Sequence, residues 1–172
     1  EDCEEGADLW GVDASGRQYF MDIHGNSKRF KPTGVMGANA LKQISAGKSW
    51  VYGVTPRQEV YRCALPACKD NPKWITVSGI FFKQVEVIGE EVWGLTAYGE
   101  LWFTTAGYDR FRFVQTPPLL EVAVNRDWIW GIQEKDLMVV VCRRPCFGEW
   151  RNVVGMNKRM DHLSVGDDNI WI

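Results

Sequence analysis

The sequence of 172 residues lacks the features that mark several large classes of protein. No apolar run reaches the roughly 18–20 residues that a membrane-spanning helix needs. Basic residues form only short pairs such as Lys28-Arg29 and Arg143-Arg144, so no cluster is available to neutralise the phosphates of a nucleic acid. No segment repeats its apolar residues with a sustained helical period, which predicts almost no helix.

The residue types that usually carry catalysis or bind metals are scarce or scattered. The two histidines, His24 and His162, lie far apart in the repeat register, and we interpret both as surface or loop residues. The glycines at 34 and 37 are not followed by the lysine of a phosphate-binding loop. Asp167 and Asp168 lack the spaced ligands of a calcium loop and are interpreted as part of a turn. We therefore predict neither an enzyme nor a bound metal or cofactor.

Glycine and tryptophan are abundant, with 17 and nine residues, and both recur in a fixed arrangement. A glycine stands between an aromatic and an aliphatic residue at Gly11, Gly53, Gly94 and Gly131. The spacings between these glycines are 42, 41 and 37 residues, and Ile172 stands 41 residues after the last of them. A near-constant period of roughly 40 residues is the sequence mark of a repeat architecture.

Each full repeat contains short apolar runs with the character of strands. In the clearest copy these runs are 41–46, 50–55, 59–63 and 73–78, and each is bounded by glycine, proline or polar turn residues. Aromatic residues recur at the same depth of the third and fourth strands, which suggests plugs between stacked sheets. A four-stranded sheet cannot bury its faces alone, whereas sheets packed around an axis can. We therefore predict an all-β fold, a β-propeller of four-stranded antiparallel blades.

The period divides the chain into a single propeller domain, residues 1–172, with about four repeats. Their approximate bounds are 1–40, 41–81, 82–118 and 119–159, followed by a partial repeat at 160–172. The first residue falls inside one unit, and the last residue ends the second strand of another. Because a four-bladed ring would leave a duplicate strand, we expect the chain to be part of a propeller of five or six blades. A four-bladed ring with atypical ends is the alternative.

The five cysteines form two close pairs and one single residue, Cys3. Cys63 follows the glycine of its repeat by 10 residues and Cys142 by 11, so the pairs hold equivalent places in two repeats separated by a third. A radial array would keep them apart, which disfavours a four-cysteine zinc site. We predict the local disulfides Cys63–Cys68 and Cys142–Cys146 and an extracellular setting, with free cytosolic thiols as the alternative. Cys3 would then pair with a segment outside this sequence or with another chain.

Three stretches carry a family pattern: LKQISAGKSWVYGVTPRQEVYR, FKQVEVIGEEVWGLTAYGELWF and LLEVAVNRDWIWGIQEKDLMVV. They resemble tectonin repeats, and the resemblance covers roughly residues 8–172. It implies a tectonin β-propeller like those of extracellular lectins such as fish-egg lectins and tachylectin-like proteins. It further implies binding of glycans or bacterial lipopolysaccharide in innate defence. The fourth unit departs from the pattern at Glu121, Asn125 and Val139, so a site made from every repeat need not be complete there.

One repeat position changes its residue type from blade to blade. It lies three residues before the glycine position, where the second strand opens, and is occupied by Asp8, Trp50, Glu91, Trp128 and Asn169. A position that varies inside a repeat scaffold is expected at the surface, and a mixture of aromatic and polar side chains suits a sugar. Asp127 lies beside it in a loop. The other interpretation is that the two tryptophans pack against the next blade.

These expectations favour a secreted, non-enzymatic lectin that recognises a multivalent surface through loops on one face. Each repeated site would be weak, and avidity would supply the useful affinity. Tectonin repeats also occur in intracellular scaffold proteins, so the alternative function is a protein-interaction scaffold. Closed cysteine pairs would support the secreted interpretation, and free thiols would oppose it.

Overall fold

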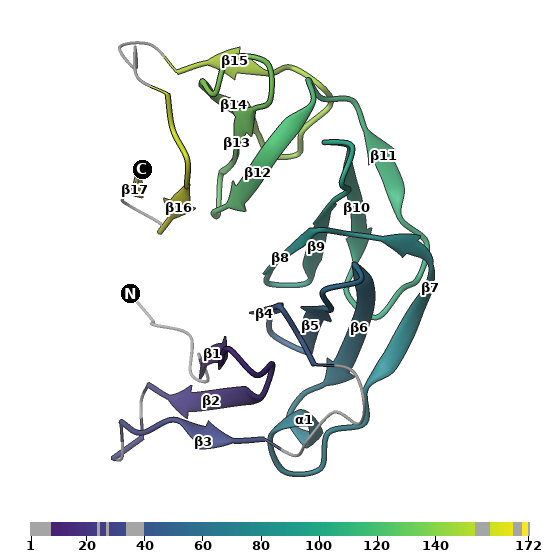
Figure 1. The fold of residues 1–172 in the computed structure, drawn as a ribbon, viewed down its shortest axis with the longest axis vertical. Coiled ribbons are helices and arrows are strands. Elements are labelled where there is room, and N and C mark those ends of the chain that lie inside the picture. The colour runs from purple at the N-terminus through teal and green to yellow at the C-terminus, as the bar shows by residue number, and fades with distance from the viewer. Residues whose placement is uncertain are drawn as a thin grey trace.

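The computed structural model describes residues 8–23, 25–26, 28–33, 40–153, 159–166 and 170–171. In these ranges the chain forms antiparallel sheets that follow one another around an arc (Figure 1). The first and last sheets lie on either side of the open part of the arc. A short helix, α1 (Ala67–Asp70), lies in the loop after the third strand of the second sheet. None of the helices in the described ranges is long and apolar enough to cross a membrane.

The strands lie side by side in chain order within every sheet. The first sheet contains β1 (Asp8–Val12), β2 (Gln18–Asp22) and β3 (Lys31–Pro32). The second contains β4 (Gln43–Ala46), β5 (Trp50–Val54), β6 (Glu59–Ala64) and β7 (Ile75–Phe81). The third contains β8 (Gln84–Ile88), β9 (Glu91–Leu95), β10 (Leu101–Thr105) and β11 (Arg112–Val114). The fourth contains β12 (Leu119–Val124), β13 (Trp128–Gln133), β14 (Val139–Arg143) and β15 (Arg151–Asn152), and the fifth contains β16 (Ser164–Val165) and β17 (Ile170–Trp171).

The prediction of an all-β propeller with four-stranded antiparallel blades is confirmed. One predicted strand was too short at its end. The fourth strand of the second sheet continues past residue 78 to Phe81, because a bulge opposite Glu59 and Val60 absorbs Gly79 at a φ of +82°. Glycine adopts this left-handed conformation without steric penalty, so the strand bends there instead of ending.

The innermost strands of neighbouring sheets are joined by side-chain amides. Gln43 of β4 donates from Nε2 to the carbonyl of Val85 at 2.8 Å and accepts from the Val85 N–H at 2.8 Å. Gln84 of β8 makes the same pair of bonds with Val122 of β12, at 2.6 Å and 3.0 Å. A glutamine amide has both a donor and an acceptor, so it can form hydrogen bonds with both the backbone C=O and the backbone N–H of one residue on the adjacent sheet.

The repeated glycine is required by close packing inside a sheet. A Cβ atom at Gly94 would lie 2.1 Å from the Phe82 ring, and one at Gly53 would lie 2.4 Å from the Leu41 side chain. Phe82 and Leu41 begin their repeats and are fully or almost fully buried. In the second, third and fourth repeats the glycine therefore leaves room for the first apolar side chain of the repeat to lie across the second strand. Gly11 has no atom within 4 Å of such a Cβ in the described structure.

The prediction of two local disulfides is confirmed. Cys63 pairs with Cys68 and Cys142 pairs with Cys146, and in both cases the Cα atoms are 5.6 Å apart. Each bond closes the loop between the third and fourth strands of one sheet. The predictions for Cys3, His24, Asp167, Asp168 and Asn169 concern residues that lie outside the described ranges.

Candidate functional site

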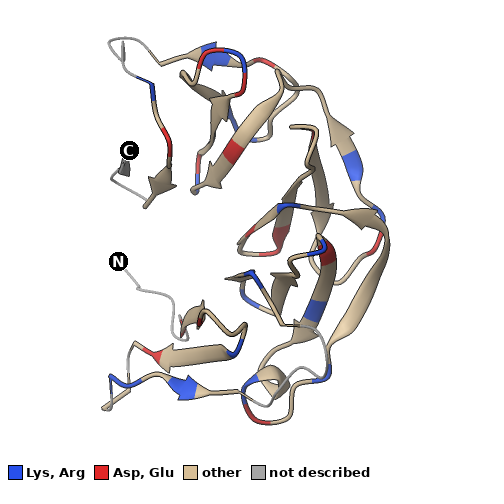
Figure 2. Ribbon diagram, viewed as in Figure 1, with Lys and Arg blue, Asp and Glu red and all other residues tan. Residues whose placement is uncertain are grey.

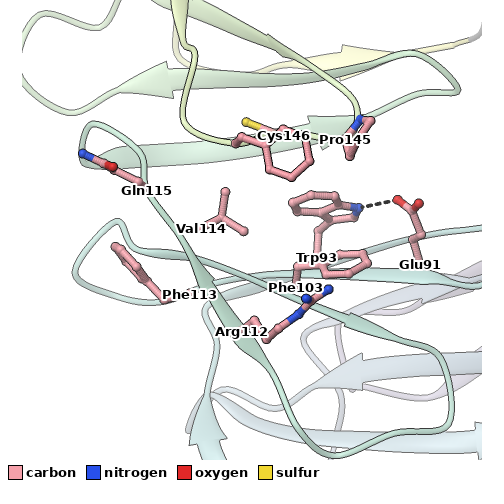
Figure 3. A pocket seen from close by; sticks show the side chains of 10 residues that line it. Glu91, Trp93, Phe103, Arg112, Phe113, Val114, Gln115, Pro145 and Cys146 are labelled. Carbon is pink, nitrogen blue, oxygen red and sulfur yellow. Dashed lines mark hydrogen bonds between the residues drawn. The ribbon is translucent and has the colours of Figure 1, made fainter.

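A hollow of about 440 Å³ lies between the third sheet and the disulfide loop of the fourth (Figure 3). We call it the aromatic hollow, because four aromatic side chains from both sheets contribute to its lining. They are Trp93 of β9, Phe103 of β10, Phe113 of β11 and Phe147 of the loop. Its polar lining residues are Glu91, Arg112 and Gln115.

The floor of the aromatic hollow is a pair of rings that contact each other at a tilt of 47°. Trp93 and Phe103 are opposite each other in the β9–β10 ladder, and their ring centroids are 4.7 Å apart. Trp93 is only 3% exposed, whereas Phe147 is 83% exposed and Phe113 is also open to solvent. The apolar surface is thus fixed at its base and accessible at its rim. Such an arrangement can receive a flat apolar face of a ligand.

The carboxylate of Glu91 is held at one side of the hollow by three N–H groups. Trp93 donates from Nε1 at 3.2 Å, and Arg144 donates from Nε at 3.1 Å and approaches through Nη2 at 2.5 Å. All three contacts are to Oε2. Oε1 accepts no hydrogen bond from the described residues, so it is available to a hydroxyl group of a ligand.

Arg144 lies in the loop that the fourth sheet's disulfide closes, and the loop between β12 and β13 holds it in position. Its guanidinium donates from Nη1 to the carbonyls of Asn125 and Arg126, at 2.8 Å and 2.6 Å. Its backbone N–H donates to the carbonyl of Asp127 at 2.9 Å. The charge of Arg144 therefore balances that of Glu91 and is fully engaged by the protein.

Arg112 is the second cation at the hollow, and it is not balanced in this way. Its guanidinium carbon lies 5.5 Å from the centre of the Phe103 ring, its neighbour across the β10–β11 ladder. The side chain is exposed, and the described residues include no carboxylate within ion-pair distance of it. With one carboxylate and two guanidinium groups, the hollow carries a net positive charge.

The equivalent junction between the first and second sheets is closed. Asp8 takes the place of Glu91 and pairs with Lys69, at 2.5 Å. The Lys69 ammonium lies 5.5 Å from the centre of the Phe20 ring, the residue equivalent to Phe103, and Phe20 is only 8% exposed. Lys69 follows its disulfide and covers this ring.

The junction between the second and third sheets is filled by different side chains. Trp50 takes the place of Glu91, and its indole contacts the position of Gly107 in the next sheet's loop. Arg62 takes the place of Phe103, stacks on Trp50 at 5.0 Å and pairs with Asp109 at 2.9 Å. At the third of these junctions, Glu91 instead lines a hollow with exposed aromatic side chains.

The structure separates the residues that we predicted for binding. Glu91 lines the aromatic hollow, and Asp127 supports the loop behind it. Asp8 and Trp50 belong to the two other junctions. Trp50 packs against the loop of the next sheet at Gly107, which is the arrangement that the alternative interpretation describes. Trp128 opens the second strand of the fourth sheet, with 37% of its surface exposed. Asn169 is not among the described residues.

Sequence reasoning missed most of the hollow: Phe103, Arg112, Phe113, Gln115 and Phe147 were not predicted to bind a ligand. The sequence contains one indication for Phe103, because the residue type at its repeat position varies. Phe103 stands nine residues after the glycine of its repeat, and the preceding repeat has Arg62 at that position. Phe147 comes from a loop of another sheet, and no spacing within one repeat indicates that it lines the same hollow as Phe103.

A comparison of the sequence with models of protein families identifies the family of this chain. The family model described as "Tectonin domain" matches residues 2–116, which is 115 of the 172 residues. The chain belongs to the tectonin family. A comparison with curated protein sequences finds no match.

Solved structures similar to this tectonin chain include several β-propellers. Human WBSCR16 gives a TM-score of 0.68 at 11% identity, over 99% of this chain and 58% of that one. Yeast RCC1 (Prp20), solved with Kap60, gives 0.65 at 8% identity, over 91% of this chain and 49% of that one. A chain of the nidogen/laminin complex gives 0.59 at 11% identity, over 86% of this chain and 61% of that one. The tectonin chain thus spans about half to three fifths of these structures, and identities this low show the fold alone.

Proposed function

We propose that this tectonin protein is an extracellular, non-enzymatic lectin that binds a glycan or a bacterial surface saccharide in the aromatic hollow. The observation that carries the proposal is the combination of an aromatic platform with a fixed carboxylate and an unbalanced guanidinium at its edge. A sugar ring has an apolar C–H face and a rim of hydroxyl groups. Sites for such ligands combine apolar surface with a few placed polar groups.

In this proposal the apolar face of one sugar ring lies against Phe103 and Phe147. Glu91 Oε1 accepts from a hydroxyl group, and Arg112 donates to another oxygen. Because three donors already hold Glu91 Oε2, the carboxylate is oriented before the ligand arrives. Preorganisation of this kind reduces the entropy lost on binding.

The two disulfides support the extracellular part of the proposal, since such bonds persist in oxidising compartments. A single shallow site of this size gives modest affinity. Several copies presented together to a repetitive surface, such as bacterial lipopolysaccharide, would bind through avidity. An innate-defence role follows from that ligand class and is part of the proposal.

A protein-interaction scaffold is the second candidate function. A hollow of about 550 Å³ lies between the second and third sheets, and Phe81 and Tyr98 on its edge are exposed, Tyr98 by 84%. Aromatic side chains are enriched at protein interfaces. The solved structure of YCF48, which is similar to this chain, contains a bound D1 peptide.

A glycan and lipopolysaccharide array with free-sugar competition tests the proposal and separates the two candidates. Phe147→Ala should weaken the competed signal by roughly tenfold, as loss of an aromatic stacking partner predicts. Tyr98→Ala is the matched control, because it removes an equally exposed ring from the other hollow, and it should leave the signal unchanged. A blank array with folded protein, verified by circular dichroism, would overturn the lectin proposal.

A further inference from the structure

A second, smaller hollow adjoins the aromatic hollow on the third sheet. It measures about 210 Å³ and shares Phe103 and Arg112 with its neighbour. We call it the basic hollow, because its own lining adds Arg110 to Arg112 and includes no acidic residue. The remaining lining residues are Thr104, Thr105 and Tyr108.

Arg112 is the wall between the two hollows. Its guanidinium lies over the Phe103 ring, and its side chain starts from the first residue of the outermost strand β11. Figure 2 shows this basic segment on the outer rim of the arc. An exposed arginine held by one ring contact can turn toward either hollow at little cost, so a ligand that spans both can keep its contact with the guanidinium.

Arg110 adds a second guanidinium whose charge is not balanced by the described residues. Its backbone carbonyl accepts from the Thr104 hydroxyl at 2.9 Å, which anchors the chain below the side chain. The adjacent carboxylate, Asp109, is paired with Arg62 at 2.9 Å. Two arginines without a carboxylate partner in the described part of the chain favour an anionic ligand, because guanidinium groups form charge-assisted, bidentate bonds with carboxylate, sulfate or phosphate oxygens.

Size indicates that the basic hollow works together with its neighbour. Ligand pockets in proteins typically measure about 300–1,000 Å³. The aromatic hollow reaches this range alone, whereas the basic hollow at about 210 Å³ does not. Arg110 also borders the hollow near Tyr98, but Glu100 lines that hollow and its carboxylate would repel an anion.

We infer that the two hollows form one groove for an acidic oligosaccharide. An uncharged ring occupies the aromatic hollow, and the neighbouring ring carries an anionic substituent that binds between Arg110 and Arg112. The inference rests on the proposed lectin function and adds to it the ligand class and the residue that selects it. Arg110 is the selective residue, because it contributes to the basic hollow and does not line the aromatic one.

Calorimetric titration of the full chain with three tetrasaccharides tests the inference: neutral chitotetraose, carboxylate-bearing hyaluronan tetrasaccharide and sulfated heparin tetrasaccharide. At low ionic strength at least one acidic ligand should bind about fivefold or more tightly than chitotetraose. This preference should shrink at high salt, where charges are screened. Arg110→Gln should abolish the preference and leave the affinity for chitotetraose within about twofold.

Arg57→Gln is the matched control, since it removes one exposed positive charge from a turn of the second sheet and should leave the preference intact. Equal binding of neutral and acidic ligands, or equal losses in the two variants, would overturn the inference while leaving the lectin proposal in place. If none of the three tetrasaccharides binds, the inference is also overturned. The lectin proposal fails separately, when the whole glycan array is blank.

Discussion

Gln43 and Val85 belong to different sheets, yet the side-chain amide of one bonds both backbone polar groups of the other at 2.8 Å. Gln84 repeats the arrangement with Val122. In the fourth repeat the same position is Glu121, and Leu163 stands where the valines stand. A carboxylate can accept from a backbone N–H but cannot donate to a carbonyl. Glu121 instead lies 3.5 Å from Nδ1 of His162.

Glu121→Gln should therefore stabilise the fold by restoring a donor toward the last sheet. One additional hydrogen bond contributes about 1 kcal/mol, which corresponds to a rise in Tm of about 2–4 °C for a chain of this size. Gln84→Glu is the reciprocal control and should lower Tm by a similar amount. Thermal unfolding followed by circular dichroism measures both, and a lower Tm in the Glu121→Gln variant would contradict the argument.

Glu86 predicts a dependence of stability on pH. Burial raises its pKa from 4.5 to about 7, and the charge of Glu121 adds to the rise, while hydrogen bonds from Gln84 and Gln43 oppose it. Between about pH 4.5 and 7 the folded protein retains a proton that the unfolded chain has released. The contribution of Glu86 to the free energy of unfolding therefore falls as pH rises through this window and is constant above it. The loss is on the order of 3 kcal/mol at most, at about 1.4 kcal/mol per pKa unit.

Glu86→Gln removes this titration and should be more stable than the parent at pH 8. Denaturant unfolding at pH 5, 6, 7 and 8 measures the difference between the two proteins, which cancels the other titrating groups. The gap should widen from pH 5 to pH 7 and then level off. A gap that narrows over this range would show that the sign is wrong.

Gly94→Ala tests the packing of the repeat glycine. The new Cβ would meet the buried ring of Phe82 at 2.1 Å, so either the ring or the strand must move. Overpacking of this kind destabilises by about 1–3 kcal/mol. Gly11→Ala changes the same motif position where no described atom lies within 4 Å, and it should leave Tm almost unchanged. Equal Tm values for the two variants would refute the packing explanation.

The two disulfides should differ in their effect on ligand binding. Replacing Cys142 and Cys146 with serine frees the loop that presents Arg144 to Glu91 and Phe147 to the aromatic hollow. Glycan affinity should fall by about tenfold or more. Replacing Cys63 and Cys68 removes the same number of bonds from another junction and should retain the affinity. Non-reducing mass spectrometry first checks that both pairs are closed in the parent, and a similar loss of binding in both variants would argue against a role for the Arg144 loop.

Trp50 and Trp128 hold the same repeat position in different surroundings. Trp50→Ala should lower the free energy of unfolding by about 2–4 kcal/mol, because it empties the space between Arg62 and Gly107. Trp128→Ala should have a smaller effect, since the side chain is 37% exposed. Chemical denaturation compares the two, and the reverse order of stabilities would be inconsistent with the junction described for Trp50.

The fold was predictable because its determinants are local and periodic. Gly53 and Gly94 mark second strands at a fixed spacing, and each is needed by a side chain of its own repeat, Leu41 or Phe82. The pairing of Cys63 with Cys68 follows from the same periodicity, because both residues lie in one loop. Such features can be recognised in a single sequence because they recur from repeat to repeat.

The candidate site was less predictable because it depends on what the next sheet presents. Glu91 was identified by its variable repeat position, yet that position marks contact with a neighbouring loop as much as exposure to a ligand. Lys69 follows its disulfide, whereas Arg144 lies inside a disulfide loop that is one residue shorter. The two junctions also differ in exposure, since Phe103 is partly exposed and Phe20 is buried. No property of one repeat alone predicts this difference.

Both described disulfides join cysteines of a single repeat, four or five residues apart in sequence, so neither links one sheet covalently to another. A protease that cut one connection between sheets would leave fragments held together only by packing and hydrogen bonds. The cut molecule would stay assembled in native buffer and keep its shape. It would separate into pieces on a denaturing gel even without a reducing agent, unlike a protein whose disulfides tie distant segments together.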